Sequence, residues 1–202
     1  MKSLYLVRHA EQNINGTYWA DANLTTWGLE QAARTGKRVK QLGCRKIASS
    51  DLNRASQTSE VINRYLNTRV DYFPELREIN YGVWEGLSFS YVSENYANLI
   101  AEMNKRELDI PYPGGESGQD VYRRAQKVIE ALLHEDAFQS IAIVSHGELI
   151  LTILCGILNI GFEKRLDVAW LDHCGITRID CDPALDKKHI CYINEISHLE
   201  EH

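Results

Sequence analysis

Disulfide frameworks and metal-binding cysteine pairs find little support in this sequence. Its 202 residues include five cysteines, which are scattered, odd in number and never arranged as CxxC. Such a count favours reduced thiols over a disulfide framework. Histidine lies close to cysteine only at His173–Cys174 and His189–Cys191, and isolated pairs of this kind are more typical of sheet edges than of zinc ligands. We therefore predict no metal site.

Long hydrophobic runs are also missing. No apolar run approaches the roughly 20 residues that a membrane-spanning helix needs. The first residues, MKSLYLVRHAEQ, contain only a short apolar stretch before Arg8, which is too short for the core of a signal peptide. We expect a soluble, cytoplasmic protein that has no membrane partner.

Positive charge is in short supply as well. The chain has 22 Lys and Arg against 28 Asp and Glu, which gives a net charge of -6. Binding to DNA or RNA needs a broad basic face, so we expect no nucleic-acid partner. A few clustered arginines can still bind a small anion, and a phosphorylated metabolite therefore remains a possible ligand.

Short, continuous apolar runs are present, and they predict strands that are buried on both faces. The two runs cover residues 4–7 and 141–144, and residues 46–49 predict a third, weaker strand. Runs without polar alternation are typical of central parallel strands. Helical periodicity follows these runs over residues 29–39, 55–66 and 121–133. This alternation predicts an α/β fold, a three-layer α/β/α sandwich with a mostly parallel central sheet.

The chain shows no internal repeat and no long linker, so we predict a single domain over residues 1–202. Residues 80–115 differ from the rest because they are rich in aromatic residues, glycine and proline. We expect this segment to be a lid-like insertion that covers the active site and carries one helix, over residues 91–106.

Four polar residues follow the predicted strands in a way that indicates an anion site. His9 comes after the first strand with Arg8 beside it, His146 comes after residues 141–144, and Arg54 lies in the first turn of a helix. Ligands of open α/β sheets bind beyond the carboxyl ends of the strands, where helix N-termini favour anions. Two arginines and two histidines there suit a phosphoryl group, because the planar guanidinium binds two oxygens at once.

Six motifs, in order and at compatible spacing, carry a resemblance to a known family. They are LVRHAE at residues 6–11, LTTWGLEQA at 24–32, SSDLNRASQT at 49–58, LREINYGVWEG at 76–86, PGGES at 113–117 and SHGE at 145–148. Together they resemble the histidine phosphatase (phosphoglycerate mutase-like) superfamily, in its small phosphatase branch. The resemblance runs from about residue 3 to residue 180, nearly the whole chain.

The resemblance implies a role for each of these residues. His9 would be the nucleophile that forms a phosphohistidine. Arg8, Arg54 and His146 would bind the phosphoryl oxygens and stabilise their growing charge. Glu78 would protonate the leaving group and then help to activate water, which requires a raised pKa. No metal or other cofactor is expected, because the arginines take the place that a divalent ion has in kinases.

Three further positions belong to this reading. Asn15 and Gly147 would contact the phosphorylated substrate. Ala10 departs from the family pattern, in which many members carry glycine after the nucleophile. An alanine would crowd the pocket if this position needed a positive φ.

We therefore expect a metal-independent phosphomonoesterase that acts through a phosphohistidine on a small phosphorylated metabolite. A mutase that moves a phosphoryl group within phosphoglycerate is the alternative enzyme, and a non-catalytic phospho-ligand binding module is the alternative of another class. The short spacing between Glu78 and Ser117 and the form of the motif at residues 76–86 favour the phosphatase. Aromatic residues of the insertion suggest a wall for an apolar or ring-bearing leaving group; they are Tyr81, Trp84, Phe89, Tyr91, Tyr96 and Tyr112.

Overall fold

The computed structural model describes residues 1–202 except 15, 19–20, 136, 183, 186 and 201–202. Its described part contains a six-stranded sheet in the order β3-β2-β4-β1-β5-β6. The strands are β1 (Lys2–Arg8), β2 (Lys46–Ser49), β3 (Val70–Tyr72), β4 (Ser140–Ser145), β5 (Ile176–Asp182) and β6 (Lys187–Glu195). The pairings from β3 to β1 are parallel, and β5 and β6 add antiparallel pairings at one edge. The predicted α/β sandwich with a mostly parallel sheet is confirmed.

The two central strands divide the apolar core between both faces of the sheet. Leu4 and Ile143 belong to the larger core cluster, whereas Tyr5, Val7 and Val144 belong to the cluster on the other face. Since successive side chains of a strand point to opposite faces, a run without polar residues needs cover on both sides.

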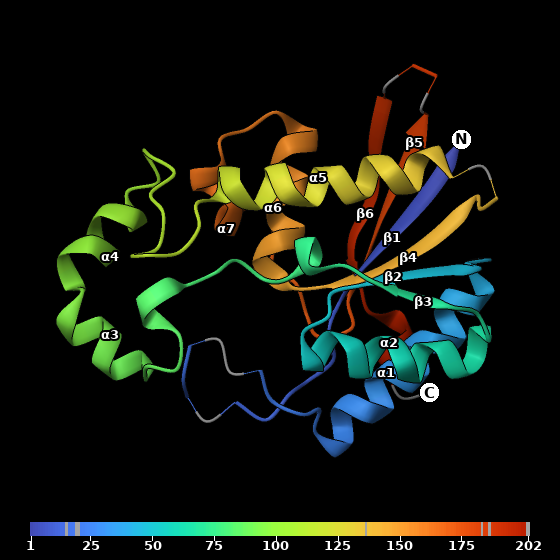
Figure 1. Cartoon of the computed structure of the whole chain (residues 1–202), viewed down its shortest axis with the longest axis horizontal. Coiled ribbons are helices and arrows are strands. Elements are labelled where there is room, and N and C mark those ends of the chain that lie inside the picture. The colour runs from blue at the N-terminus through green and yellow to red at the C-terminus, as the bar shows by residue number, and fades with distance from the viewer. Residues whose placement is uncertain (15, 19–20, 136, 183, 186, 201–202) are drawn as a thin grey trace.

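Helices supply that cover in two layers, which lie above and below the sheet in Figure 1. The main ones are α1 (Thr26–Gln41) and α2 (Asn53–Leu66) on one face, and α5 (Gly118–His134) and α6 (Gly147–Leu158) on the other. Thr25 caps α1, and Ser117 with Asp120 forms a capping box at the start of α5. Among the described residues, no helix combines the length and the hydrophobicity that a membrane crossing requires.

The inserted segment differs from our expectation of one helix over residues 91–106, which is wrong. It forms two short helices, α3 (Phe89–Asn95) and α4 (Ala97–Asn104), which extend to one side of the molecule in Figure 1. The chain leaves helical geometry at Tyr96, with φ -121° and ψ 22°. The Tyr96 ring packs edge-on against Trp84, with the ring centroids 5.4 Å apart. The helix break therefore coincides with a tertiary contact of Tyr96.

Three parallel strands end at the same level of the sheet. Arg8 is paired with Ser145, and Ser49 is paired with Val144. The next residue of the first strand continues this contact, because the His9 amide donates to the Ser145 carbonyl at 2.8 Å. The residues that follow β1, β2 and β4 are thus brought together at the carboxyl end of the parallel strands.

Candidate active site

A pocket of about 190 Å³ opens at the carboxyl end of the parallel strands. Four of the residues predicted from the sequence line it: Arg8, His9, Arg54 and Glu78. Its remaining lining comes from the loop after His9, from the inserted segment and from the turn before β5: Gln12, Ile14, Thr17, Tyr18, Tyr81, Phe89 and His173. Among these described lining residues, Arg8, Arg54 and Glu78 are ionisable groups of opposite sign, and most of the others are uncharged.

His9 is held at the base of the pocket in one tautomer. Its Nδ1 lies 2.8 Å from the carbonyl oxygen of Ala10, and because a carbonyl can only accept, this nitrogen carries the proton. Burial and the nearby guanidinium groups of Arg54 and Arg8 hold the pKa of His9 well below its usual range. The imidazole is therefore neutral, with a lone pair on Nε2.

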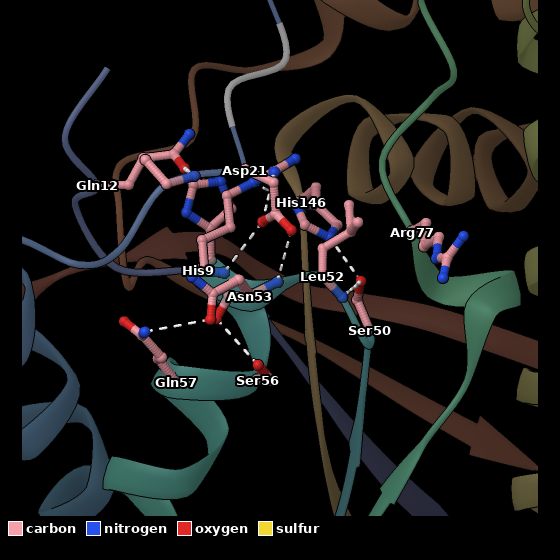
Figure 2. Close-up of polar contacts among 12 residues, drawn as sticks. His9, Gln12, Asp21, Ser50, Leu52, Asn53, Ser56, Gln57, Arg77 and His146 are labelled. Atoms are coloured by element: carbon pink, nitrogen blue, oxygen red, sulfur yellow. Dashed lines mark hydrogen bonds and ion pairs between the residues drawn. The ribbon is translucent and has the colours of Figure 1, made fainter. Parts of the chain in front are cut away.

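His146 supports Arg54 from beneath the pocket. The Arg54 Nε donates to His146 Nδ1 at 3.1 Å, so His146 carries its proton on Nε2, which lies 2.8 Å from the Ser50 hydroxyl (Figure 2). Burial, followed by the charge of Arg54, holds the pKa of His146 well below its usual range. The ring contacts His9, with the centroids 5.2 Å apart, but both of its nitrogens already have partners.

Arg54 is buried and Arg8 is partly buried, and negative charge only partly offsets the burial of the two guanidinium groups. The side chain of Arg54 is 3% exposed and forms an ion pair with Asp21 at 3.4 Å. Burial lowers the pKa of Arg54 and of Arg8, although Glu78 acts in the opposite direction on both. Arg8 donates from Nη1 to the Leu171 carbonyl, while its buried Nε has no partner in the part of the chain that the structure describes. These groups suit a bound anion.

Glu78 lies half-buried against the N-terminus of α6. Its carboxylate accepts hydrogen bonds from the backbone amides of Ile79 at 3.0 Å, Glu148 at 3.2 Å and Leu149 at 3.0 Å. Burial and the neighbouring Glu148 carboxylate nonetheless raise the pKa of Glu78. A raised pKa favours the protonated form of the carboxyl group, which is the form that can donate a proton.

The other carboxylates considered for the acid role have different surroundings. Asp51 binds Arg77 through two hydrogen bonds of 2.6 Å, and Arg77 lies to the side of the histidines in Figure 2. Glu75 and Glu85 do not belong to the lining of the pocket.

A buried polar network that the sequence analysis missed lies behind Glu78. The Glu148 carboxylate accepts from Tyr81 at 2.8 Å, from Tyr112 at 3.1 Å and from Arg165 Nε at 2.9 Å. Arg165 belongs to the short helix α7 (Arg165–Val168). The network joins the inserted segment to α6, and so to the residues that hold Glu78.

The three further positions of the sequence analysis have different outcomes. Asn15 lies outside the described residues. Gly147 is the first residue of α6, and a Cβ added there would lie 3.7 Å from Arg8 Nε, an ordinary contact distance. Ala10 is fully buried and is not among the described non-glycine residues with a positive φ. The condition under which alanine would crowd the pocket, a positive φ at this position, is therefore not met.

The aromatic wall is only partly where the sequence suggested. Tyr81 and Phe89 line the pocket, whereas Trp84 is 2% exposed and packs inside the core. Tyr18 also lines the pocket, and its ring meets Phe89 edge-on at 4.7 Å. His173 is a lining residue that lies outside the six motifs. It stands in an irregular turn, and no local periodicity pointed to it.

The chain belongs to the histidine phosphatase superfamily (branch 1), whose family model matches residues 4–190. It is therefore an enzyme of the phosphatase class within that superfamily, as its motifs predicted. The site geometry described above lies entirely within the matched residues.

Individual relatives cover nearly the whole chain. The protein named "Putative phosphoserine phosphatase 2" of Hydrogenobacter thermophilus is 29% identical over 100% of this chain and 99% of its own length. The protein named "Probable phosphoglycerate mutase GpmB" of Escherichia coli is 32% identical over 92% of this chain and 87% of its own length. The solved structure of Bacillus stearothermophilus YhfR is 25% identical and has a TM-score of 0.89 over 99% of this chain and 100% of its own.

Proposed function

We propose that the protein hydrolyses phosphomonoesters of small metabolites through a phosphohistidine formed on His9, without a metal ion. The observation that carries this proposal is the state of the His9 ring. Its Nδ1 proton is held by the Ala10 carbonyl, which leaves a neutral Nε2 as nucleophile in a pocket that Arg8 and Arg54 also line. A neutral imidazole beside concentrated positive charge is what attack on a phosphate dianion requires.

In the first step, His9 Nε2 attacks the phosphorus atom and an N–P bond forms. The bond from phosphorus to the ester oxygen breaks, and the leaving oxygen takes the proton of Glu78. Arg8 and Arg54 bind the three non-bridging oxygens and stabilise the charge that they carry in the transition state. His146 fixes Arg54 in place through their 3.1 Å hydrogen bond, and it would donate to the phosphoryl group only after exchanging one of its present partners.

In the second step, water attacks the phosphohistidine. Glu78, now a carboxylate, takes a proton from that water, and the N–P bond breaks with its electron pair returning to His9 Nε2. Inorganic phosphate leaves, and both residues regain their starting states. One carboxyl group thus serves as acid and then as base.

The charges along the pocket favour a phosphatase over a mutase. Among the described lining residues, the cations are Arg8 and Arg54, and both are needed for one phosphoryl group. A phosphoglycerate carries a carboxylate in addition, and a bisphosphorylated intermediate carries a second phosphate, which would lie against uncharged walls. Tyr18, Tyr81 and Phe89 instead suit an uncharged leaving group with an apolar face. The similarity to a protein named as a mutase keeps phosphoryl transfer as the second candidate.

Hydrolysis of p-nitrophenyl phosphate over about pH 5 to 8 tests the proposal, with and without EDTA. Activity should survive EDTA and disappear in His9→Asn, while His134→Asn, at the exposed end of α5, should retain it. Glu78→Gln should accumulate an acid-labile phosphoryl group, because p-nitrophenolate leaves without a proton whereas the water step still needs a base. Full activity in His9→Asn would overturn the proposal.

A further inference from the structure

His173 is the pocket residue that the proposed reaction does not use. It belongs to a turn between α7 and β5 that is tied to the end of β1. The Cys174 amide donates to the Arg8 carbonyl at 2.9 Å, and the Arg8 guanidinium donates to the Leu171 carbonyl on the other side of His173. The turn is therefore fixed to the end of β1, directly before His9.

The same turn is braced from β6. The Asp172 amide donates to Asn194 Oδ1 at 2.8 Å, and Asn194 Nδ2 donates to the Asp172 carboxylate at 2.7 Å. Cys174 is buried and has a φ of 60°, in the left-handed region that non-glycine residues rarely adopt. Such a conformation persists only where the surroundings impose it. The turn thus holds His173 in a fixed position, and the unfavourable backbone conformation of Cys174 is the energetic cost of doing so.

The His173 ring packs against His9, with the centroids 5.4 Å apart and the planes tilted by 52°. His146 is at a similar distance from His9, but it is fully buried and its two nitrogens are occupied. His173, in contrast, faces the pocket, and its nitrogens have no hydrogen-bond partner among the residues described. It can therefore bind a ligand without giving up an existing bond.

The place of His173 beside the His9 ring decides which part of a substrate it meets. In-line attack by His9 puts the leaving group on the far side of phosphorus, near Glu78. A ring that packs beside the nucleophile instead lies near the non-bridging oxygens. Burial and the Arg8 guanidinium lower the pKa of His173 to about 4, so near neutral pH it offers one N–H donor without charge.

We propose that His173 is a further catalytic residue, which donates a hydrogen bond to a non-bridging phosphoryl oxygen in the substrate and in the phosphohistidine. This inference rests on the proposed function. It gives the dianion a neutral donor in addition to the two arginines, from a turn that no family motif includes.

Two variants separate the hydrogen bond from the packing. His173→Phe keeps a ring against His9 but has no donor, whereas His173→Gln keeps an N–H donor. We expect His173→Phe to lower kcat/KM by about 10- to 100-fold, the effect of one hydrogen bond to a charged group. The factor should be equal for p-nitrophenyl phosphate and for alkyl phosphates, and inhibition by inorganic phosphate should weaken with it. His173→Gln should recover part of the loss, and His189→Phe on exposed β6 should cause none.

A loss that differs between leaving groups, or no loss at all, would overturn the inference while wild-type hydrolysis through His9 still stands. If the wild type neither hydrolyses phosphate esters nor becomes phosphorylated on His9, the proposed function fails instead. Calorimetric binding of inorganic phosphate to wild type and His173→Phe then tests the contact without turnover, and equal affinities would contradict it.

Discussion

Arg54 and Arg165 are equally buried, each 3% exposed, yet their electrostatic surroundings are opposite. Burial lowers the pKa of Arg165, but Glu148, Tyr112 and Asp109 outweigh it, so the pKa is raised overall. Burial also lowers the pKa of Arg54, and there the neighbouring carboxylates do not compensate. Nearby negative charge thus more than offsets the burial of Arg165, whereas it does not offset the burial of Arg54.

This difference teaches more than burial does. A buried arginine with enough counter-charge stabilises a fold, as Arg165 does by joining α7 to Glu148 of α6 and to Asp109 of the inserted segment. A buried arginine with a deficit of negative charge, at the base of a pocket, is prepared for an anion that arrives from solution. The difference therefore distinguishes an arginine that stabilises the fold from one that is placed to bind a ligand in the pocket.

The largest effect on stability should come from removing Arg165, whose burial is offset by negative charge. Arg165→Met leaves the Glu148 carboxylate without its cation and should lower the free energy of unfolding by about 3–5 kcal/mol. Urea denaturation measures this. Arg123→Met is the matched control, because its ion pair with Asp120 is exposed and should contribute about 1 kcal/mol or less. Equal losses in the two variants would remove the contrast.

Arg54→Ala should affect catalysis instead. We expect kcat/KM to fall by about 10²- to 10³-fold, the effect of losing one donor to the transition state, with a smaller change in stability than for Arg165→Met. Steady-state kinetics and thermal unfolding test both parts. Arg54→Lys should recover little, because an ammonium cannot form the bond to His146 and bind two oxygens at once. A variant that unfolds readily but keeps its kcat/KM would reverse the two roles.

Glu148→Gln should shift the pH profile. Glu78 must be protonated to act as the acid, so activity is lost as the pH rises through its pKa. Burial and the Glu148 charge raise that pKa, and removal of the charge lowers it. The alkaline limb of kcat/KM for an alkyl phosphate should therefore move to lower pH, while Glu130→Gln, exposed on α5, should leave it in place. A shift to higher pH would contradict the assignment of Glu78 as the acid.

The smallest effect on stability and on kcat/KM is expected at Ala10. Although it follows His9, this residue contributes to the fold and not to the described lining of the pocket. Its φ is not positive and its amide donates to the Thr58 hydroxyl at 3.0 Å, so glycine gives no conformational advantage. Ala10→Gly should reduce stability by roughly 0.5–1 kcal/mol and change kcat/KM little. A large gain in kcat/KM would mean that alanine restricts the site after all.

The sequence allowed prediction of those strands and helices whose own residues show a clear apolar pattern. The strands β1, β2 and β4 and the helices α1, α2 and α5 were predicted in this way, whereas α6, which follows β4, was not. The antiparallel strands β5 and β6 were missed, although Ile179 and Cys181 alternate with Asp180 and Asp182, because such short alternation is weak without its partner strand. The break at Tyr96 has no glycine or proline to indicate it in the sequence, and it coincides with a tertiary contact to Trp84.

The candidate site shows the same division. Arg8, His9, Arg54 and Glu78 are found from motifs, and the structure brings them to one pocket; their roles stay predictions until they are measured. His173, by contrast, is recognised only when the chain folds, because its position depends on contacts with residues far away in the sequence.

The central place of β1 also determines when a newly made chain can become active. Val7 is paired with Val144 on one side and with Ile176 on the other. A nascent chain on the ribosome carries His9 long before these partners have been translated, and contacts between residues so distant in sequence form slowly. A chain that ends before β5 therefore contains His9 but lacks the strand that pairs with Val7 on that side, so the proposed reaction depends on residues translated late.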